Sequence, residues 1–270
     1  MRPRPDAGPT TMRGARPDPV TMSRRIRRVL VGVAVVPIAV TVVLGIEIAR
    51  ARIKPRSDYG PVLSLDANLG GSGGPTVVWL GDSTASGVGV ARAEDALPRQ
   101  TASAIGPPQR LVSLAVSGAT VDDVLRLQAP HVPSDAAIVV IDIGANDVAH
   151  GRRLTTFRRH YEQVLSHLPK RSKVVLLGVP DMGSPPRLDQ PLRAIVGWRG
   201  RAFDRVVRSL AHRHGAAYVD IAGATGPSFR HSPAAYFFGD LYHPNAAGYA
   251  LWARAVVPVL GPIVGAAHTG

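Results

Sequence analysis

From Thr76 onward, short apolar runs rich in β-branched residues alternate with segments of helical periodicity, and this alternation limits the possible folds most strongly. The strand candidates are residues 76–80, 110–115, 136–143, 173–179 and 216–221, and the helix candidates are residues 93–105, 121–127, 154–168, 192–214 and 246–260. The strand runs are continuously apolar, which is typical of parallel strands covered on both faces. Strands that alternate with helices favour right-handed βαβ units. We therefore expect an α/β protein, a three-layer α/β/α sandwich around a mostly parallel five-stranded sheet.

Small and polar residues follow three of these predicted strands. Ser83 comes after the first strand in Gly-Asp-Ser, Gly118 after the second in Val-Ser-Gly-Ala-Thr, and Asn146 after the third in Gly-Ala-Asn-Asp. In open parallel sheets, ligands bind beyond the carboxyl ends of the strands. Taken singly, Ser83 suits a helix N-cap, and Gly118 and Asn146 suit turns. Taken together, a hydroxyl nucleophile and two donors for an oxyanion favour an acyl-transfer site.

A carboxylate and an imidazole lie three residues apart further along the chain, in Asp240-Leu-Tyr-His243. A histidine alone is more often a structural or surface residue. On a tight turn or a first helical turn, residues i and i+3 lie on one side, so Asp240 can orient the His243 ring and stabilise its positive charge. With Ser83, these two residues complete the minimum set for acyl transfer through a covalent intermediate.

The four blocks, in this order, resemble those of the SGNH hydrolase superfamily, also called the GDSL esterases and lipases, over residues 76–260. The resemblance implies a flavodoxin-like sandwich. It also implies that Ser83 is the nucleophile, His243 the general base and Asp240 its orienting partner. The oxyanion hole would be formed by the N–H groups of Ser83 and Gly118 and the side-chain amide of Asn146.

Two residues depart from the pattern of many family members. Thr84 stands where many have Leu, and Ser113 stands where many have Asn in the second block. Neither change removes a catalytic atom, so we expect them to affect local packing and substrate preference. The residues around Ser83 do not form the G-x-S-x-G motif of the α/β-hydrolases.

An uncharged apolar run of 18 residues, 29–46, extends to Ala49 if Glu47 lies among lipid headgroups, and it has the length of a membrane-spanning helix. Six arginines between residues 13 and 28 precede it, and four Lys or Arg between residues 50 and 56 follow it. This excess predicts an anchor in the cell membrane with the catalytic domain outside. The alternative is a secreted protein, because residues 49–51 have the A-x-A form of a signal cleavage site.

The net charge of +13 is concentrated near that apolar run, since residues 1–60 hold 12 Lys and Arg against 4 Asp and Glu. A nucleic-acid partner is therefore not expected. The chain has no cysteine, which excludes a thiolate nucleophile, thiolate metal sites, iron–sulfur clusters and disulfides. We expect no cofactor and no metal, and nothing in the sequence indicates an oligomeric state.

The predicted order along the chain is a disordered basic segment (1–28), a membrane anchor or signal sequence (29–49), a linker (50–75), the SGNH hydrolase domain (76–264) and a tail (265–270). The expected activity is hydrolysis of carboxylic esters with lipid-like acyl groups, and the apolar segment 192–198 is a candidate cover for an acyl chain. The alternatives are an O-acetyl esterase acting on cell-envelope glycans and a non-catalytic protein that binds acyl groups or glycans.

Overall fold

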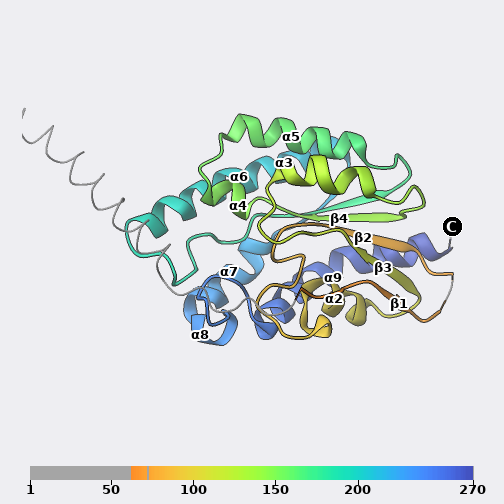
Figure 1. Ribbon diagram of the computed structural model, residues 1–270, viewed down its shortest axis with the longest axis horizontal. Coiled ribbons are helices and arrows are strands. Elements are labelled where there is room, and N and C mark those ends of the chain that lie inside the picture. The colour runs from red at the N-terminus through yellow and green to blue at the C-terminus, as the bar shows by residue number, and fades with distance from the viewer. Residues whose placement is uncertain (1–61, 72, 270) are drawn as a thin grey trace, which may run out of the picture. The chain divides into compact units, whose positions relative to one another are not determined.

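The computed structural model describes residues 62–71 and 73–269, in which helices cover both faces of one mixed sheet (Figure 1). The six strands, in the spatial order β1-β3-β2-β4-β5-β6, are β1 (Ala67–Leu69), β2 (Thr76–Gly81), β3 (Gln109–Ser113), β4 (Ile138–Asp142), β5 (Lys173–Leu177) and β6 (Ala217–Val219). Strands β2 to β6 run parallel, and β1 pairs antiparallel with β3. The segments predicted at 1–28 and 29–49 lie outside the described residues.

Helices connect the strands and form the outer layers. They are α2 (Leu97–Ile105), α3 (Val121–Asp123), α4 (Ala145–Ala149), α5 (Leu154–His167), α6 (Leu192–His214), α7 (Ile221–His231), α8 (Pro233–Tyr236) and α9 (Ala246–Thr269), with short 3-10 turns η1 (Ala93–Asp95) and η3 (Ala129–His131) and a π-helical turn η2 (Val124–Gln128). Helix α3 starts with a capping box, in which the Thr120 N–H donates to Asp123 Oδ2 at 2.8 Å. Helix α6 ends at Gly215, which has the left-handed conformation that glycine favours.

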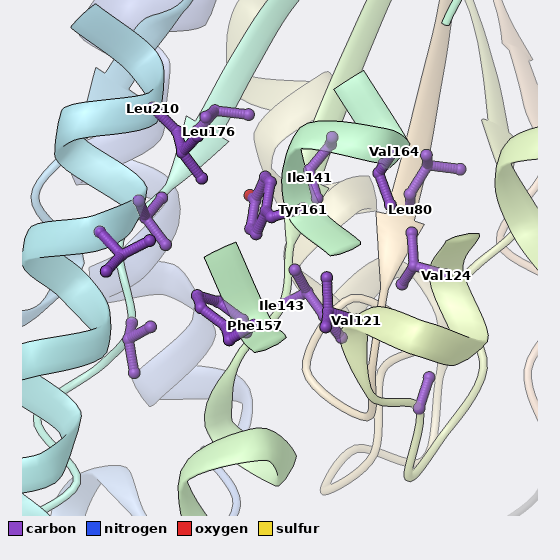
Figure 2. Close-up of a cluster of buried hydrophobic side chains, with 14 of the residues drawn as sticks. Leu80, Val121, Val124, Ile141, Ile143, Phe157, Tyr161, Val164, Leu176 and Leu210 are labelled. Carbon is purple, nitrogen blue, oxygen red and sulfur yellow. The ribbon is translucent and has the colours of Figure 1, made fainter. Parts of the chain in front are cut away.

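Strand β2 lies near the middle of the sheet because all six of its residues are apolar or small enough to be buried. Its side chains alternate between the two faces. Val78 and Leu80 belong to the core between the sheet and helices α3, α5 and α6, where Phe157 and Tyr161 of α5 pack edge to face (Figure 2). This continuous burial on both faces is what the apolar run of residues 76–80 predicts.

The second core lies between the opposite face of the sheet and helices α2 and α9, and it contains Val77 and Trp79 of β2 (Figure 1). Among the described residues, one helix, Ala246–His268 of α9, is long and apolar enough to cross a membrane by length and composition alone. Tyr249, Val256 and Leu260 are fully or almost fully buried against the domain, so we assign α9 to the second core.

Three expectations are corrected by the fold. The sheet has six strands because β1 lies in the expected linker, and the buried side chain of Leu65 belongs with it to the hydrolase domain. The three residues of β1 include no β-branched side chain, so the strand leaves no visible pattern. Helix α9 continues to Thr269, so most of the expected tail at 265–270 is helical. The expected helix at 121–127 is one α-turn followed by the π-turn η2.

Candidate active site

Ser83 lies on the turn that follows β2, at the carboxyl edge of the sheet. The parallel strands have the order β3-β2-β4-β5-β6, so the chain moves to opposite sides of β2 to form β3 and β4. Such a reversal opens a crevice at the strand ends, which is where ligands bind in this class of sheet. The turn packs closely against the end of β4. A Cβ added at Gly81 would lie 2.2 Å from the carbonyl oxygen of Asp142. Sheet topology therefore places Ser83 in a site suited to ligand binding.

His243 and Asp240 reach Ser83 from the loop that precedes α9. His243 Nε2 is 3.0 Å from Ser83 Oγ, and His243 Nδ1 is 2.5 Å from Asp240 Oδ2. The three side chains are buried and form one continuous relay. In the neutral ring that donates its Nδ1 hydrogen to Asp240, the lone pair of Nε2 can accept the proton of the serine hydroxyl. The structure thus brings together the three residues that the sequence singled out.

Asp240 is held in its ionised form by the turn around it. Its Oδ1 accepts the N–H groups of Tyr242 and His243, at 2.9 and 3.0 Å. Burial alone would raise the pKa of this carboxyl, but the His243 ring, by its hydrogen bond and its charge, and these two N–H groups lower it below the ordinary value. Leu241 adopts a φ of 60° within the turn, a conformation that is uncommon outside glycine.

Three donors are available on the strand ends around the serine. The N–H groups of Ser83 and Gly118 donate no hydrogen bond to any group in the part of the chain that the structure describes. Asn146 uses one amide hydrogen to bond the carbonyl oxygen of Ala119 at 2.9 Å, which leaves the second free. Gly118 has a φ of 81° in an exposed turn between Val116 and Ala119, and this conformation favours glycine.

Asn146 is positioned by the residue that follows it. Asp147 is fully buried, accepts the Val121 N–H with Oδ2 at 3.0 Å, and lies 2.6 Å from Arg152 Nε through Oδ1. Burial raises the pKa of this carboxyl to about 6 although the hydrogen bond from Val121 and the charge of Arg152 act to lower it. These contacts tie the start of α4 to the start of α3, so the Asn146 amide lies beside the cavity that Ser83 lines.

A narrow, mainly apolar cavity adjoins the serine and the histidine. Its volume is about 40 Å³, and its walls come from Ser83, Asn146 and His243 together with the 180–185 loop, α7, and the aromatic side chains of Phe229, Phe237 and Trp252. The segment 192–198, expected as a cover for an acyl chain, does not line it. No cluster of three or more His, Asp or Glu side chains within the described residues is arranged to hold a metal ion.

Sequence patterns did not reveal Gln128, whose buried side chain bonds both backbone groups of Gly81. Its Oε1 accepts the Gly81 N–H and its Nε2 donates to the Gly81 carbonyl oxygen, each at 2.8 Å. A glutamine at the end of a helical turn, just beyond the helix expected at 121–127, has no motif that marks it. Of the aromatic walls of the cavity, Phe229 lies on α7 and Phe237 just after α8, in a stretch without clear periodicity, and Trp252 lies on α9, within the helix expected at 246–260.

Comparison with known proteins agrees with this geometry. The family model of the GDSL-like Lipase/Acylhydrolase family matches residues 79–251. The chain belongs to this family. A GDSL-like esterase of Mycobacterium tuberculosis is 34% identical to this chain over 181 residues, which cover 64% of this chain and 57% of the relative. The match thus spans little more than half the length of that relative.

Solved structures of family members and other hydrolases share the fold. The phospholipase A1 of Streptomyces albidoflavus NA297 aligns with a TM-score of 0.53 and 24% identity, covering 70% of this chain and 99% of that structure. A member of the lipolytic G-D-S-L family from Veillonella parvula aligns with a TM-score of 0.56 and 19% identity, covering 68% and 97%. At these identities the likeness concerns the fold, and it agrees with the predicted flavodoxin-like sandwich.

Proposed function

We propose that the protein is a serine esterase that hydrolyses carboxylic esters through an acyl-enzyme. The relay from Ser83 Oγ to His243 Nε2 and from His243 Nδ1 to Asp240 is the observation that carries the proposal. Family membership supports it, because ester hydrolysis is the chemistry after which the family is described.

In the first half of the reaction, Ser83 Oγ attacks the ester carbonyl carbon while His243 Nε2 takes the hydroxyl proton. The negative charge that forms on the carbonyl oxygen is stabilised by the N–H groups of Ser83 and Gly118 and the free amide hydrogen of Asn146. His243 then gives its proton to the departing alcohol oxygen, and an acyl group remains on Ser83. Asp240 keeps the ring in the correct tautomer and stabilises its positive charge throughout.

In the second half, a water molecule gives a proton to His243 Nε2 as its oxygen attacks the acyl carbon. The same donors stabilise the second tetrahedral intermediate. Its collapse breaks the bond to Ser83 Oγ, which recovers its proton from His243, and the carboxylic acid leaves. The enzyme returns to its starting protonation state, so one histidine serves as both base and acid.

The cavity supports an apolar acyl group and limits its length. The aromatic walls suit the acyl part of a lipid-like ester. A volume of about 40 Å³ is small, because a single water needs roughly 10–15 Å³ by this measure. The small volume favours the second candidate function, removal of acetyl groups from cell-envelope glycans, in which the acyl group is short and the alcohol is a sugar.

An ester panel tests the proposal and separates these candidates. The full chain in detergent would be assayed with p-nitrophenyl esters of increasing acyl length and with acetylated sugars. We expect turnover by the parent and by Ser117→Ala, a change at an exposed serine near the site, and a loss of roughly 10³-fold or more in kcat for Ser83→Ala. Full activity of Ser83→Ala would refute the mechanism. A preference for acetyl esters would favour the glycan candidate, and a preference for long chains the lipid candidate.

We further propose that residues 29–49 anchor the protein in the cell membrane with the hydrolase domain outside, as the distribution of basic residues suggests. The domain should then be degraded when a protease is added to intact cells whose wall has been permeabilised, and a membrane fraction should retain the uncleaved chain. Protection until the membrane is lysed would contradict this topology. Release of a shortened chain into the medium would favour secretion after cleavage.

A further inference from the structure

Two buried carboxyl groups flank the turn that carries Ser83, and the Thr84 hydroxyl lies between them. Thr84 Oγ1 is 2.7 Å from Asp142 Oδ2 and 3.0 Å from Asp82 Oδ1. The relative exposure of Asp82 is 1%, that of Asp142 3% and that of Thr84 8%. None of the three takes part in the proposed reaction, and Thr84 stands where many family members have Leu. We call Asp82, Thr84 and Asp142 the carboxyl clamp.

Counting hydrogens in the clamp shows that one proton is required besides that of the hydroxyl. A threonine hydroxyl carries a single hydrogen and can donate to one acceptor only. Its other contact is favourable only if the second carboxyl is protonated and donates to Thr84 Oγ1. Two ionised carboxylates this close in a buried site would also repel each other with little screening by water. The geometry therefore favours one carboxylic acid and one carboxylate.

The electrostatics of the two carboxyls agree with this count. Burial, and next the charge of Asp142, raise the pKa of Asp82 to about 7, despite the hydrogen bonds from Thr84 and the charge of His243. Burial likewise raises the pKa of Asp142 to about 6 against the hydrogen bond from Thr84. Because the carboxyls interact strongly, their protons belong to the pair rather than to either residue.

The ionisable groups that face the clamp from other elements are His243 of the loop before α9, Tyr161 of α5 and Tyr249 of α9. Burial, and next the charge of Asp142, raise the pKa of both tyrosines well above the ordinary value, so they stay neutral in the working range. Of these groups, His243 is the one that becomes cationic. Full ionisation of the clamp would therefore place an additional negative charge near the histidine.

The clamp is continuous with the backbone of the serine turn. The Thr84 N–H donates to Asp82 Oδ1 at 3.1 Å, and the Asp82 N–H donates to the carbonyl oxygen of Asp142 at 3.2 Å. Ser83 lies between Asp82 and Thr84. Both neighbours are hydrogen-bonded to Asp142 at the end of β4, and they are also hydrogen-bonded to each other. A change in the clamp would move the Ser83 hydroxyl relative to His243.

We propose that Asp82 and Asp142 share one proton through the Thr84 hydroxyl and that this clamp positions Ser83 for attack. The inference rests on the proposed role of Ser83 as nucleophile. When the shared proton is lost to solvent at alkaline pH, the two carboxylates repel each other, the turn shifts from β4 and the acylation rate falls. Thr84 and Asp142 are then positioning residues that act through the backbone of Ser83.

The test compares pH profiles of kcat and KM for the parent, Asp142→Asn, Thr84→Val and Thr84→Ser. Asn at position 142 can donate to Thr84 Oγ1 as a carboxylic acid does, but it has no proton to lose. We expect kcat of the parent to fall as the pH rises above about 7, and the ratio of kcat at about pH 9 to that at about pH 7 to be higher in Asp142→Asn. Thr84→Val should lower kcat by about tenfold or more with a smaller change in KM, and Thr84→Ser should restore it to within about threefold. Equal alkaline limbs in the parent and Asp142→Asn, or parental kinetics in Thr84→Val, would overturn the proposal.

Thermal unfolding tests the shared proton independently of activity. Both pKa values lie above 3.8, the ordinary value of Asp, so the folded parent keeps protons that the unfolded chain releases between about pH 4 and about pH 7. Its stability is therefore greatest on the acid side of that window and falls as the pH rises through it. The Tm of Asp142→Asn relative to the parent should increase by several degrees from about pH 5 to about pH 8. A Tm difference that does not change with pH would overturn the shared proton. Activity in Ser83→Ala would instead refute the proposed function.

Discussion

Ser83 lies on a turn that the sheet holds, whereas His243 lies on a loop held largely by its own hydrogen bonds. The serine turn is bonded to the end of β4 and to the buried side chain of Gln128. The histidine loop is stabilised by Asp240 Oδ1, which accepts two N–H groups of the same loop, and by one bridge between Phe237 and Pro244. The nucleophile is thus fixed by long-range contacts. The base is fixed mostly by contacts within a few residues of the chain, and Arg187 adds hydrogen bonds to the carbonyl oxygens of Asp240 and Leu241.

This difference predicts how each half of the site responds to substitution. The sheet-held half is the Ser83 turn, and the loop-held half is the loop that carries Asp240 and His243. A change in the sheet-held half should alter stability as well as catalysis, because buried polar groups lose their partners. A change in the loop-held half should alter the orientation of the ring and hence catalysis, with less effect on the core. The predictions that follow test this contrast, from the largest expected effect to the smallest.

Asp240→Asn should have the largest effect among these changes. The amide can still accept an N–H group through its oxygen, but its NH₂ would face Nδ1 and favour the wrong tautomer of His243. We expect kcat to fall by about 10³–10⁴-fold. Asp135→Asn, a change at an exposed carboxylate with no contact to the site, is the matched control for charge. Steady-state kinetics with a short ester measures both, and a loss below tenfold for Asp240→Asn would count against the relay.

Asn146→Ala should reduce kcat by about 10²–10³-fold with a smaller change in KM, because its free amide hydrogen stabilises charge that develops only in the transition state. The bond from Asn146 to the Ala119 carbonyl is lost too, so Tm must be measured alongside. A fall in Tm with unaltered kcat would show that Asn146 is only a turn residue.

Gln128→Leu should destabilise the sheet-held half of the site, which carries Ser83. It leaves the N–H of Gly81 buried and without its partner, which costs about 1–3 kcal/mol in the free energy of unfolding. The Gly81 carbonyl oxygen keeps the hydrogen bond from the Val116 N–H. Gln163→Leu, at an exposed position of α5, controls for the change of side chain and should leave stability within about 0.5 kcal/mol of the parent. Denaturant titration of the two variants gives the comparison, and equal stabilities would refute the proposed difference between the halves.

Leu241→Gly should have the smallest effect. Glycine relieves the cost of a positive φ, about 1–2 kcal/mol for other residues, and loses part of this gain through the entropy of the unfolded chain. We expect stability within about 1 kcal/mol of the parent, while Leu241→Val, whose branched side chain tolerates this φ poorly, should be less stable than either. If the valine variant equals the glycine variant in denaturant titration, the conformation at 241 carries no strain.

The same contrast explains how much the sequence could predict. The strands β2 to β6 and the residues at their ends follow from apolar runs, since burial on both faces of a sheet demands them. Ser83, Gly118 and Asn146 could therefore be singled out as candidates from their places after the strands, and Asp240 and His243 from their spacing. The strand β1 and the cavity walls depend on contacts between distant segments and leave no local periodicity. The contact of Gln128 with Gly81 requires the position of η2 beside β2 to be known, and the pairing of Asp82 with Asp142 requires the register of β2 against β4.

Covalent trapping tests the central role of Ser83 most directly. The full chain would be treated with an activated phosphonate ester, which leaves a stable adduct on an activated serine, and then digested and analysed by mass spectrometry. We predict one adduct per chain on the Ser83 peptide, loss of ester hydrolysis in proportion to labelling, no adduct in Ser83→Ala and parental labelling in Ser117→Ala. An adduct on another residue, or continued hydrolysis by the fully labelled protein, would contradict the assignment of Ser83 as the nucleophile.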